Sequence, residues 1–131
     1  MKKQIAALLL GALLLAGCGK EAKPVKEVSF VKITPQEAKT MMEEQPEAVV
    51  LDVREESEYL QGHVPGAVLL PVGTITAETA AKAIPAQDTT VLVYCRSGNR
   101  SKTASKALAE LGYSAVYEFG GIMSWPYEVE K

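Results

Sequence analysis

Cys95 has the sequence surroundings that suggest chemistry most directly. It follows the β-branched run at residues 89–94 and opens the segment 95–100, which is Cys-Arg-Ser-Gly-Asn-Arg. Gly98 permits a tight turn and Asn99 tolerates unusual φ, so the backbone N–H groups of this segment can converge as an anion nest. A thiol at the base of such a nest, before a helix N-terminus, ionises easily because the thiolate is stabilised.

The same segment is suited to binding a sulfur anion. Its nest would stabilise a persulfide anion on Cys95, and the side chains of Arg96 and Arg100 could attract an anionic donor such as thiosulfate. The alternative is a buried structural cysteine at a strand end, against which the flanking Gly, Asn and two Arg argue. We therefore expect the substrate-binding residues around catalytic Cys95 to be Arg96, Ser97, Gly98, Asn99 and Arg100.

The length of the segment argues against phosphate chemistry. Cysteine phosphatases place five residues between the cysteine and an arginine that clamps phosphate. Here Ser101 occupies that position, and Arg100 comes one residue early. A loop of six residues fits a sulfur-sized target better than phosphate or arsenate, so the spacing disfavours a phosphatase or an arsenate reductase.

The N-terminus indicates export. Lys2 and Lys3 precede an apolar run at residues 5–16, which is too short to span a bilayer easily and has the length of a signal-peptide core. The run ends in Leu-Ala-Gly-Cys at 15–18, which resembles the lipobox of bacterial lipoproteins. We expect a signal peptide over 1–17, a lipidated Cys18 with a tether over 18–27, and one domain over 28–131; an ordinary secretory signal with a chance cysteine is the alternative.

The lipobox resemblance implies where the protein resides. Cleavage before Cys18 and attachment of acyl chains would anchor the chain to the cell membrane or outer membrane, facing the periplasm or the exterior. Gly19 stands where an Asp commonly retains lipoproteins at the inner membrane, which favours the outer membrane in a cell that has two. Cys95 is then the only thiol left for chemistry, in an oxidising compartment and without a CxxC partner.

Hydrophobic periodicity predicts the elements that position Cys95. Strands are expected at 28–33, 48–53, 67–70, 89–94 and 115–119, and helices at 35–45, 55–60, 76–84 and 101–111. The helix at 35–45 has a capping box at Thr34 and Glu37, with Pro35 at its first position. Alternating strands and helices favour an α/β domain with a parallel sheet and helices on both faces. Strand ends that carry loops are where sites form in such sheets.

Other polar residues receive supporting interpretations. Asp52 and Arg54 lie at a strand end on the same sheet edge as Cys95, where we expect them to pair or to brace the active loop. Glu55, Glu56 and Glu58 are interpreted as a solvated face, and Trp125 as a core residue.

Three stretches resemble the rhodanese-like family. They are Leu-Asp-Val-Arg-Glu at 51–55, Gly-His-Val-Pro-Gly-Ala at 62–67 and Cys-Arg-Ser-Gly-Asn-Arg-Ser at 95–101. The resemblance covers about residues 28–125 and extends to Gly-Gly at 120–121 with Trp125. It implies a five-stranded parallel sheet flanked by helices on both faces. It also makes His63 a structural loop residue, with its imidazole hydrogen-bonded to neighbouring backbone, rather than a catalytic base.

The resemblance implies sulfane-sulfur transfer through a Cys95 persulfide. Cys95 would attack the outer sulfur of thiosulfate or a persulfide, and the sulfur would then pass to cyanide or a thiol acceptor. The alternative is a persulfide carrier or binding module for a partner protein at the cell envelope. No cofactor is implied. One His and one free Cys are too few ligands for a metal, and a mildly acidic chain of net charge −2 without a basic patch disfavours nucleic acid as a partner.

Overall fold

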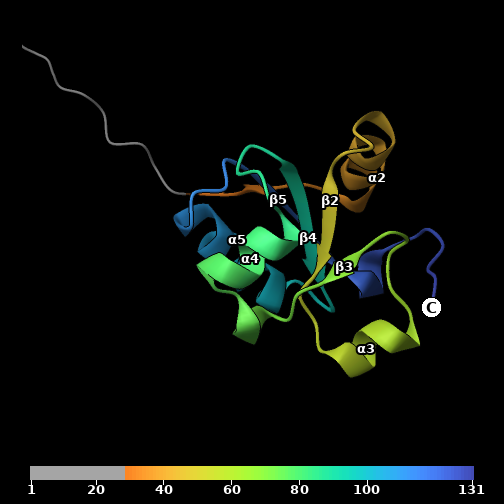
Figure 1. Ribbon diagram of the computed structural model, residues 1–131. Coiled ribbons are helices and arrows are strands. Elements are labelled where there is room, and N and C mark those ends of the chain that lie inside the picture. Colours follow the sequence, from red (N-terminus) through yellow and green to blue (C-terminus); the bar gives the residue numbers. More distant parts are fainter. Residues whose placement is uncertain (1–28) are drawn as a thin grey trace, which may run out of the picture.

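The computed structural model describes residues 29–131. The predicted signal peptide, the lipidated Cys18 and the tether therefore lie outside the described residues. The described part contains one sheet of five parallel strands in the order β1-β5-β4-β2-β3 (Figure 1). Its strands are β1 (Val31–Lys32), β2 (Val49–Asp52), β3 (Val68–Leu69), β4 (Thr90–Cys95) and β5 (Ala115–Gly121).

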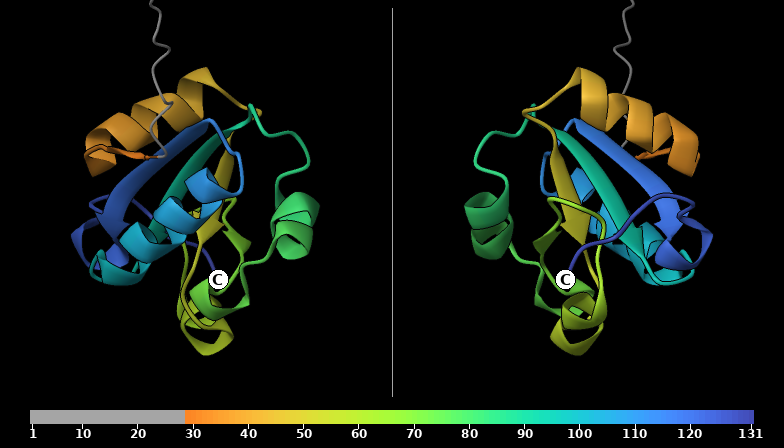
Figure 2. Two further views of the ribbon diagram at one scale, coloured as in Figure 1. Left: turned by 90° about the vertical axis from the view of Figure 1, so that its left-hand side faces the viewer. Right: turned by 90° about the vertical axis from the view of Figure 1, so that its right-hand side faces the viewer.

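Helices cover both faces of the sheet. Helix α2 (Pro35–Glu44) packs on one face, and α4 (Ala77–Ala83) and α5 (Asn99–Glu110) pack on the other (Figure 2). The remaining helical elements are α3 (Glu56–Gln61) and the short 3₁₀ turns η1 (Val72–Thr74) and η2 (Ile122–Ser124). The predicted α/β architecture is confirmed.

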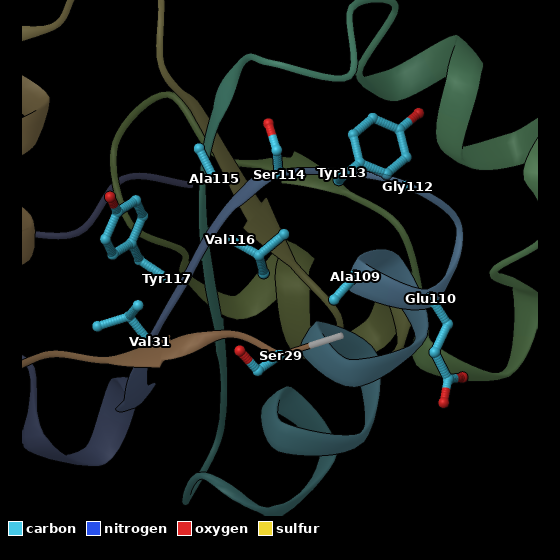
Figure 3. A pocket seen from close by; sticks show the side chains of 10 residues that line it. All are labelled: Ser29, Val31, Ala109, Glu110, Gly112, Tyr113, Ser114, Ala115, Val116 and Tyr117. Carbon is cyan, nitrogen blue, oxygen red and sulfur yellow. The ribbon is translucent and has the colours of Figure 1, made fainter. Parts of the chain in front are cut away.

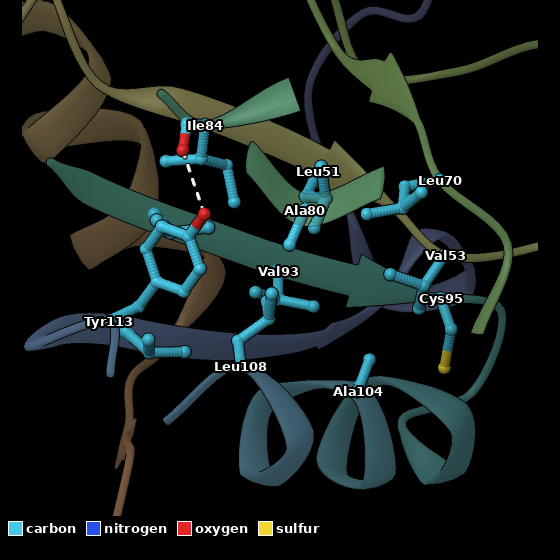
Figure 4. Close-up of a cluster of buried hydrophobic side chains, with 12 residues drawn as sticks. Leu51, Val53, Leu70, Ala80, Ile84, Val93, Cys95, Ala104, Leu108 and Tyr113 are labelled. Carbon is cyan, nitrogen blue, oxygen red and sulfur yellow. Dashed lines mark hydrogen bonds between the residues drawn. The ribbon is translucent and has the colours of Figure 1, made fainter. Parts of the chain in front are cut away.

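The central strand β4 separates two hydrophobic cores. It pairs with β2 on one side and with β5 on the other, so its side chains alternate between two covered faces. Val93 and Cys95 point into the core beneath α4 and α5 (Figure 4), where Leu108 is fully buried. Leu92 and Tyr94 of the same strand point into the core beneath α2. This alternation places the Cys95 thiol on the α5 side.

The core beneath α2 is aromatic. Trp125 is buried there, with its ring centroid 5.6 Å from that of Phe119, which in turn lies 5.3 Å from the Tyr94 ring. The Trp125 indole N–H donates to the carbonyl of Glu128 at 2.9 Å. The interpretation of Trp125 as a core residue is confirmed.

Most predicted elements form, with different ends. The capping box of α2 is present, because Thr34 and Glu37 exchange hydrogen bonds of 3.0 and 2.8 Å. Strand β1 is shorter than predicted, and η1 was not predicted at all. Helix α5 begins at Asn99 rather than Ser101, so the last residues of the expected loop belong to its first turn. Among residues 29–131, no helix has the length and apolarity needed to cross a membrane.

Candidate active site

The Cys95 thiol lies at the carboxyl end of β4, beneath the turn into α5. Its residue is 1% exposed, and the Gly98 N–H donates to Sγ at 3.0 Å. Gly98 caps the helix with a φ of +110°, a conformation that glycine adopts without strain. Asn99 is helical and has no positive φ, so the turn does not use the tolerance of asparagine for unusual φ. One left-handed glycine is enough to turn the strand end into the helix.

Hydrogen bonds, rather than a neighbouring base, activate the thiol. Burial alone would raise the pKa of Cys95, because the thiolate is poorly solvated there. The Ser101 hydroxyl, when it turns towards sulfur, and the backbone N–H groups of Ser101, Gly98 and Ser97 oppose burial and outweigh it, so the pKa of Cys95 lies below its ordinary value of 9.0. The predicted anion nest therefore exists as a set of donors directed at sulfur.

Ser101 and Glu118 form a buried polar pair beside the thiol. The Ser101 Oγ lies 3.4 Å from Cys95 Sγ and donates to Glu118 Oε2 at 2.6 Å. Glu118 lies on β5 with no exposed surface, and its Oε2 also accepts from the Gly120 N–H at 2.8 Å. The Lys32 ammonium lies 3.2 Å from Oε1. Sequence reasoning missed Glu118, although a carboxylate inside an apolar strand run was a signal that could have identified it.

The Gly-Gly pair at the end of β5 lets the active loop pack closely. A Cβ on Gly121 would lie 1.9 Å from the Arg96 carbonyl oxygen, so no larger residue fits without displacing backbone. The same carbonyl accepts a hydrogen bond from the Met123 N–H at 3.2 Å. Strand β5 and the turn η2 therefore hold the first half of the loop in place.

The two loop arginines differ in their surroundings. Arg100 makes a bidentate ion pair with Glu58 of α3, with N–O distances of 2.8 and 3.0 Å. Glu58 therefore does not belong to a freely solvated face, which corrects that expectation; the ion pair lowers the pKa of its carboxyl to about 2. The Arg96 side chain is exposed and makes no ion pair within residues 29–131. It lines a surface hollow of about 410 Å³ together with Arg54, Glu58 and Met123.

Asp52 and Arg54 pair, as expected, but they brace a different loop. The guanidinium donates to both carboxylate oxygens, with a shortest distance of 2.7 Å, and also to the Gly62 carbonyl at 2.8 Å. The Tyr94 hydroxyl donates to Asp52 and accepts from the Val64 N–H at 3.0 Å. Burial and Asp52 together raise the pKa of Tyr94. This buried network fixes the loop that starts at Gly62, next to the site.

His63 has structural contacts. Its ring stacks on Tyr59 with centroids 3.8 Å apart, and Nδ1 lies 3.0 Å from the Tyr59 carbonyl oxygen. Its Nε2 lies 3.4 Å from the Glu130 carboxylate, and the two backbones form a β-bridge. The hydrogen bond to neighbouring backbone agrees with the structural interpretation of His63.

A second hollow of about 410 Å³ lies at the opposite end of the sheet. Ser29 and Val31 line one part of it, and residues at the end of α5, in the α5–β5 turn and in β5, including Tyr113 and Tyr117, line the rest (Figure 3). It contains none of the predicted site residues. Within the described part of the chain, no three His, Cys, Asp or Glu side chains gather as a metal site would require.

The family model of the rhodanese-like domain matches residues 34–127. The chain belongs to the rhodanese-like family. The thiosulfate sulfurtransferase PspE of Escherichia coli is 40% identical over 72 residues, which cover 55% of this chain and 68% of PspE. A solved structure of a rhodanese with anions from E. coli is 36% identical with a TM-score of 0.60, and the match covers 64% of this chain and 98% of that one.

Other rhodanese-like relatives are longer proteins. The probable adenylyltransferase/sulfurtransferase MoeZ of Mycobacterium tuberculosis is 33% identical over 99 residues, which cover 75% of this chain. The match spans only 25% of MoeZ. A putative mitochondrial thiosulfate sulfurtransferase of Schizosaccharomyces pombe is 39% identical over 87 residues, which cover 59% of this chain and 60% of that protein. At the level of the family, these relatives support a sulfurtransferase.

Proposed function

We propose that this rhodanese-like protein moves sulfane sulfur from thiosulfate or a persulfide donor to a thiol or cyanide through a persulfide on Cys95. The observation that carries the proposal is the Sγ atom held beneath the loop N–H groups, with a hydrogen bond of 3.0 Å from Gly98 and a lowered pKa. Relatives named thiosulfate sulfurtransferases support it.

The reaction proceeds in two displacements. The Cys95 thiolate attacks the outer sulfur of thiosulfate, a new S–S bond forms, and sulfite leaves with the electrons of the broken S–S bond. The acceptor, cyanide or a thiolate, then attacks the outer sulfur of the persulfide, and the Cys95 thiolate is regenerated. The N–H groups that stabilise the thiolate would stabilise the negative charge of a persulfide in the same way. Arg96, which is exposed and directly follows Cys95 in the loop, attracts the anionic donor.

Thiocyanate formation tests this proposal. The purified protein, incubated with thiosulfate and cyanide, is expected to form thiocyanate, and the Cys95→Ser variant is expected to fall to the uncatalysed background. An unchanged thermal unfolding midpoint in Cys95→Ser would show that the fold is intact. Activity that survives the substitution would rule out Cys95 as the sulfur acceptor.

The same site also suits a persulfide carrier for a partner enzyme. Two observations favour this second function: Sγ is buried in the loop, and in MoeZ the matching region is a quarter of a longer adenylyltransferase/sulfurtransferase. Mass spectrometry after thiosulfate treatment distinguishes the two functions. A single added sulfur on Cys95 with negligible thiocyanate turnover would indicate a carrier, whereas rapid turnover would indicate the enzyme.

We further propose that the protein is a lipoprotein anchored through Cys18, at the cell membrane or outer membrane and facing the periplasm or exterior. The sequence supports this proposal by the order of its features: two lysines, a short apolar run and Leu-Ala-Gly-Cys at 15–18. In that location a partner must keep Cys95 reduced, since Cys95 is the only cysteine among residues 29–131.

A further inference from the structure

The Ser101 hydroxyl has one proton and several acceptors around it. Its Oγ lies 2.6 Å from Glu118 Oε2, 3.0 Å from the Gly98 carbonyl oxygen and 3.4 Å from Cys95 Sγ. Hydrogen bonds to ionised acceptors are shorter and stronger than those to neutral ones. The carboxylate of Glu118, which is also the nearest acceptor, therefore holds the proton in the resting site.

This arrangement determines whether Ser101 offers the Cys95 sulfur a lone pair or a proton. While Ser101 donates to Glu118, its oxygen presents a lone pair to sulfur, which suits a thiol S–H donor and does not suit a thiolate. Ser101 stabilises the thiolate only when its hydroxyl turns towards Sγ and leaves Glu118. Because Glu118 is fully buried, the abandoned carboxylate has no water to replace that hydrogen bond.

We propose that Glu118 is a positioning residue that restrains the ionisation of Cys95 by holding the only hydroxyl proton of Ser101. The loop N–H groups stabilise the thiolate, and Glu118 reduces the extent to which Cys95 ionises. The inference concerns the thiol and rests on the proposed function only for its role in sulfur transfer.

The proton balance of the step is simple. When Cys95 ionises, its own proton leaves to solvent or to an incoming base, and no electron is transferred. The Ser101 O–H rotates from Glu118 Oε2 to Sγ, and Oε2 retains the Gly120 N–H at 2.8 Å. Cys95 and Glu118 therefore compete for one hydrogen bond: while the Ser101 hydroxyl donates to Glu118 Oε2, it is not available to stabilise the Cys95 thiolate.

The other charged groups near the site are compensated or peripheral. Lys32 of β1 pairs with Glu118 Oε1 at 3.2 Å, so its ammonium offsets part of the carboxylate's charge although the lysine side chain is largely exposed. Arg100 of α5 is neutralised by Glu58 of α3, Arg54 is neutralised by Asp52 of β2, and Arg96 extends into solvent. Tyr94 is uncharged because its pKa is raised. Glu118 is the buried charge that contacts Cys95 through a single intervening group.

A purely structural role for Glu118 predicts the opposite effect on Cys95. If Glu118 served only to hold the loop, its loss would loosen the N–H groups and raise the pKa of the thiol. If Glu118 restrains ionisation, its replacement by glutamine removes a nearby negative charge and leaves only a weaker, neutral acceptor for the Ser101 proton, and the pKa of Cys95 falls. The direction of the change therefore distinguishes the two roles.

The rate of Cys95 alkylation by iodoacetamide, followed against pH on the full-length chain, measures this direction. Peptide-level mass spectrometry reports Cys95 separately from Cys18. In Glu118→Gln we expect the midpoint of the pH profile to fall by about one unit, which is roughly tenfold faster alkylation below both midpoints. A midpoint that stays or rises would overturn the inference. The exposed Glu110→Gln, which removes the same charge at the far end of α5, is the matched control and should leave the profile unchanged.

Repeating the Glu118→Gln substitution in a Ser101→Ala variant tests whether the shift in the alkylation midpoint depends on Ser101. In Ser101→Ala the carboxylate has no hydroxyl to hold, so adding Glu118→Gln should shift the midpoint by less than half as much. An equal shift in both backgrounds would overturn the role of Ser101. If Glu118→Gln does not fold, Lys32→Gln replaces it: losing the ammonium strengthens the hold of Glu118, so the midpoint should rise, and no rise would contradict the inference.

Alkylation requires no sulfur donor. A protein that forms no thiocyanate but shows these shifts would retain the Glu118 inference and lose the proposed enzyme activity. A protein that forms thiocyanate and shows no shift would retain the proposed enzyme activity and lose the Glu118 inference.

Discussion

At the residue scale, the lowered pKa of Cys95 comes from hydrogen-bond donors of the Ser101 hydroxyl and the loop backbone, and not from an ionisable neighbour. The Gly98 N–H reaches Sγ because Gly98 takes a left-handed conformation that begins α5 there. The Arg96 carbonyl, on the other side of the loop, packs against Gly121 and accepts from Met123. Two glycines thus shape the loop in different ways: Gly98 by its left-handed conformation, and Gly121 by having no side chain, which lets the Arg96 carbonyl pack against it.

Gly121→Ala tests the close approach. The added Cβ would lie 1.9 Å from the Arg96 oxygen, so the loop or the end of β5 must move, at a cost of about 1–3 kcal/mol of stability. We expect a lower denaturation midpoint in urea and at least a tenfold loss of thiocyanate formation, because the N–H groups no longer converge on sulfur.

Gly73→Ala is the matched control for this substitution. Gly73 has no heavy atom within 4 Å of an added Cβ and no positive φ. Its replacement should leave both stability and activity close to those of the original protein. If Gly121→Ala behaved like Gly73→Ala, the packing of Arg96 against Gly121 would not matter.

At the element scale, the ion pair between Arg100 and Glu58 joins α5 to α3. Both helices begin just after the carboxyl ends of strands, so the pair links two loops that surround the site. Arg100 therefore contributes to the position of α3, beyond the substrate-binding role that the sequence predicted for it. Its charge is partly neutralised for an incoming anion, which leaves Arg96 as the more available cation.

Acid titration of stability tests this link. The pKa of Glu58 is lowered from 4.5 to about 2, so the folded state prefers the charged carboxylate more than the unfolded chain does. The pair therefore stabilises the fold fully above about pH 5, and this contribution declines as the pH falls from 4.5 towards 2. We expect the unfolding midpoint of Glu58→Gln to lie below that of the original protein at pH 7 and to converge with it near pH 2. A gap that does not change with pH would show that the substitution acts through packing.

Elements were more predictable from the sequence than the contacts between them. The β-branched run before Cys95, its Gly-Asn loop and the capping box at Thr34 carry local signals, and each forms where predicted apart from the earlier start of α5. Glu118 was not identified because its role depends on the register of β5, which pairs Glu118 with Val93 of β4 and brings it beside Ser101. The pairing of Glu58 with Arg100, across 42 positions, likewise requires the fold.

At the scale of the whole molecule, the parallel sheet gives the domain two functionally different ends. Cys95, Asp52 and Gly121 are the last residues of their strands, so they lie together at the carboxyl end of the sheet. The described chain begins at the opposite, amino-terminal end of the strands, because the parallel pairing of Val31 with Tyr117 places Ser29 level with the start of β5. A chain held at its N-terminus therefore enters the domain at the end opposite the site (Figure 1).

This polarity yields a prediction for the proposed lipid anchor. If Cys18 is acylated, the full-length protein should fractionate with membranes and dissolve in detergent, and Cys18→Ser should be released into the aqueous fraction. Because the site faces away from the entry point of the chain, the anchored protein and the released variant should label at Cys95 with a charged, membrane-impermeant maleimide at the same rate. Slower labelling of the anchored form would mean that the site faces the bilayer, and an aqueous full-length protein would indicate an ordinary secretory signal instead of a lipobox.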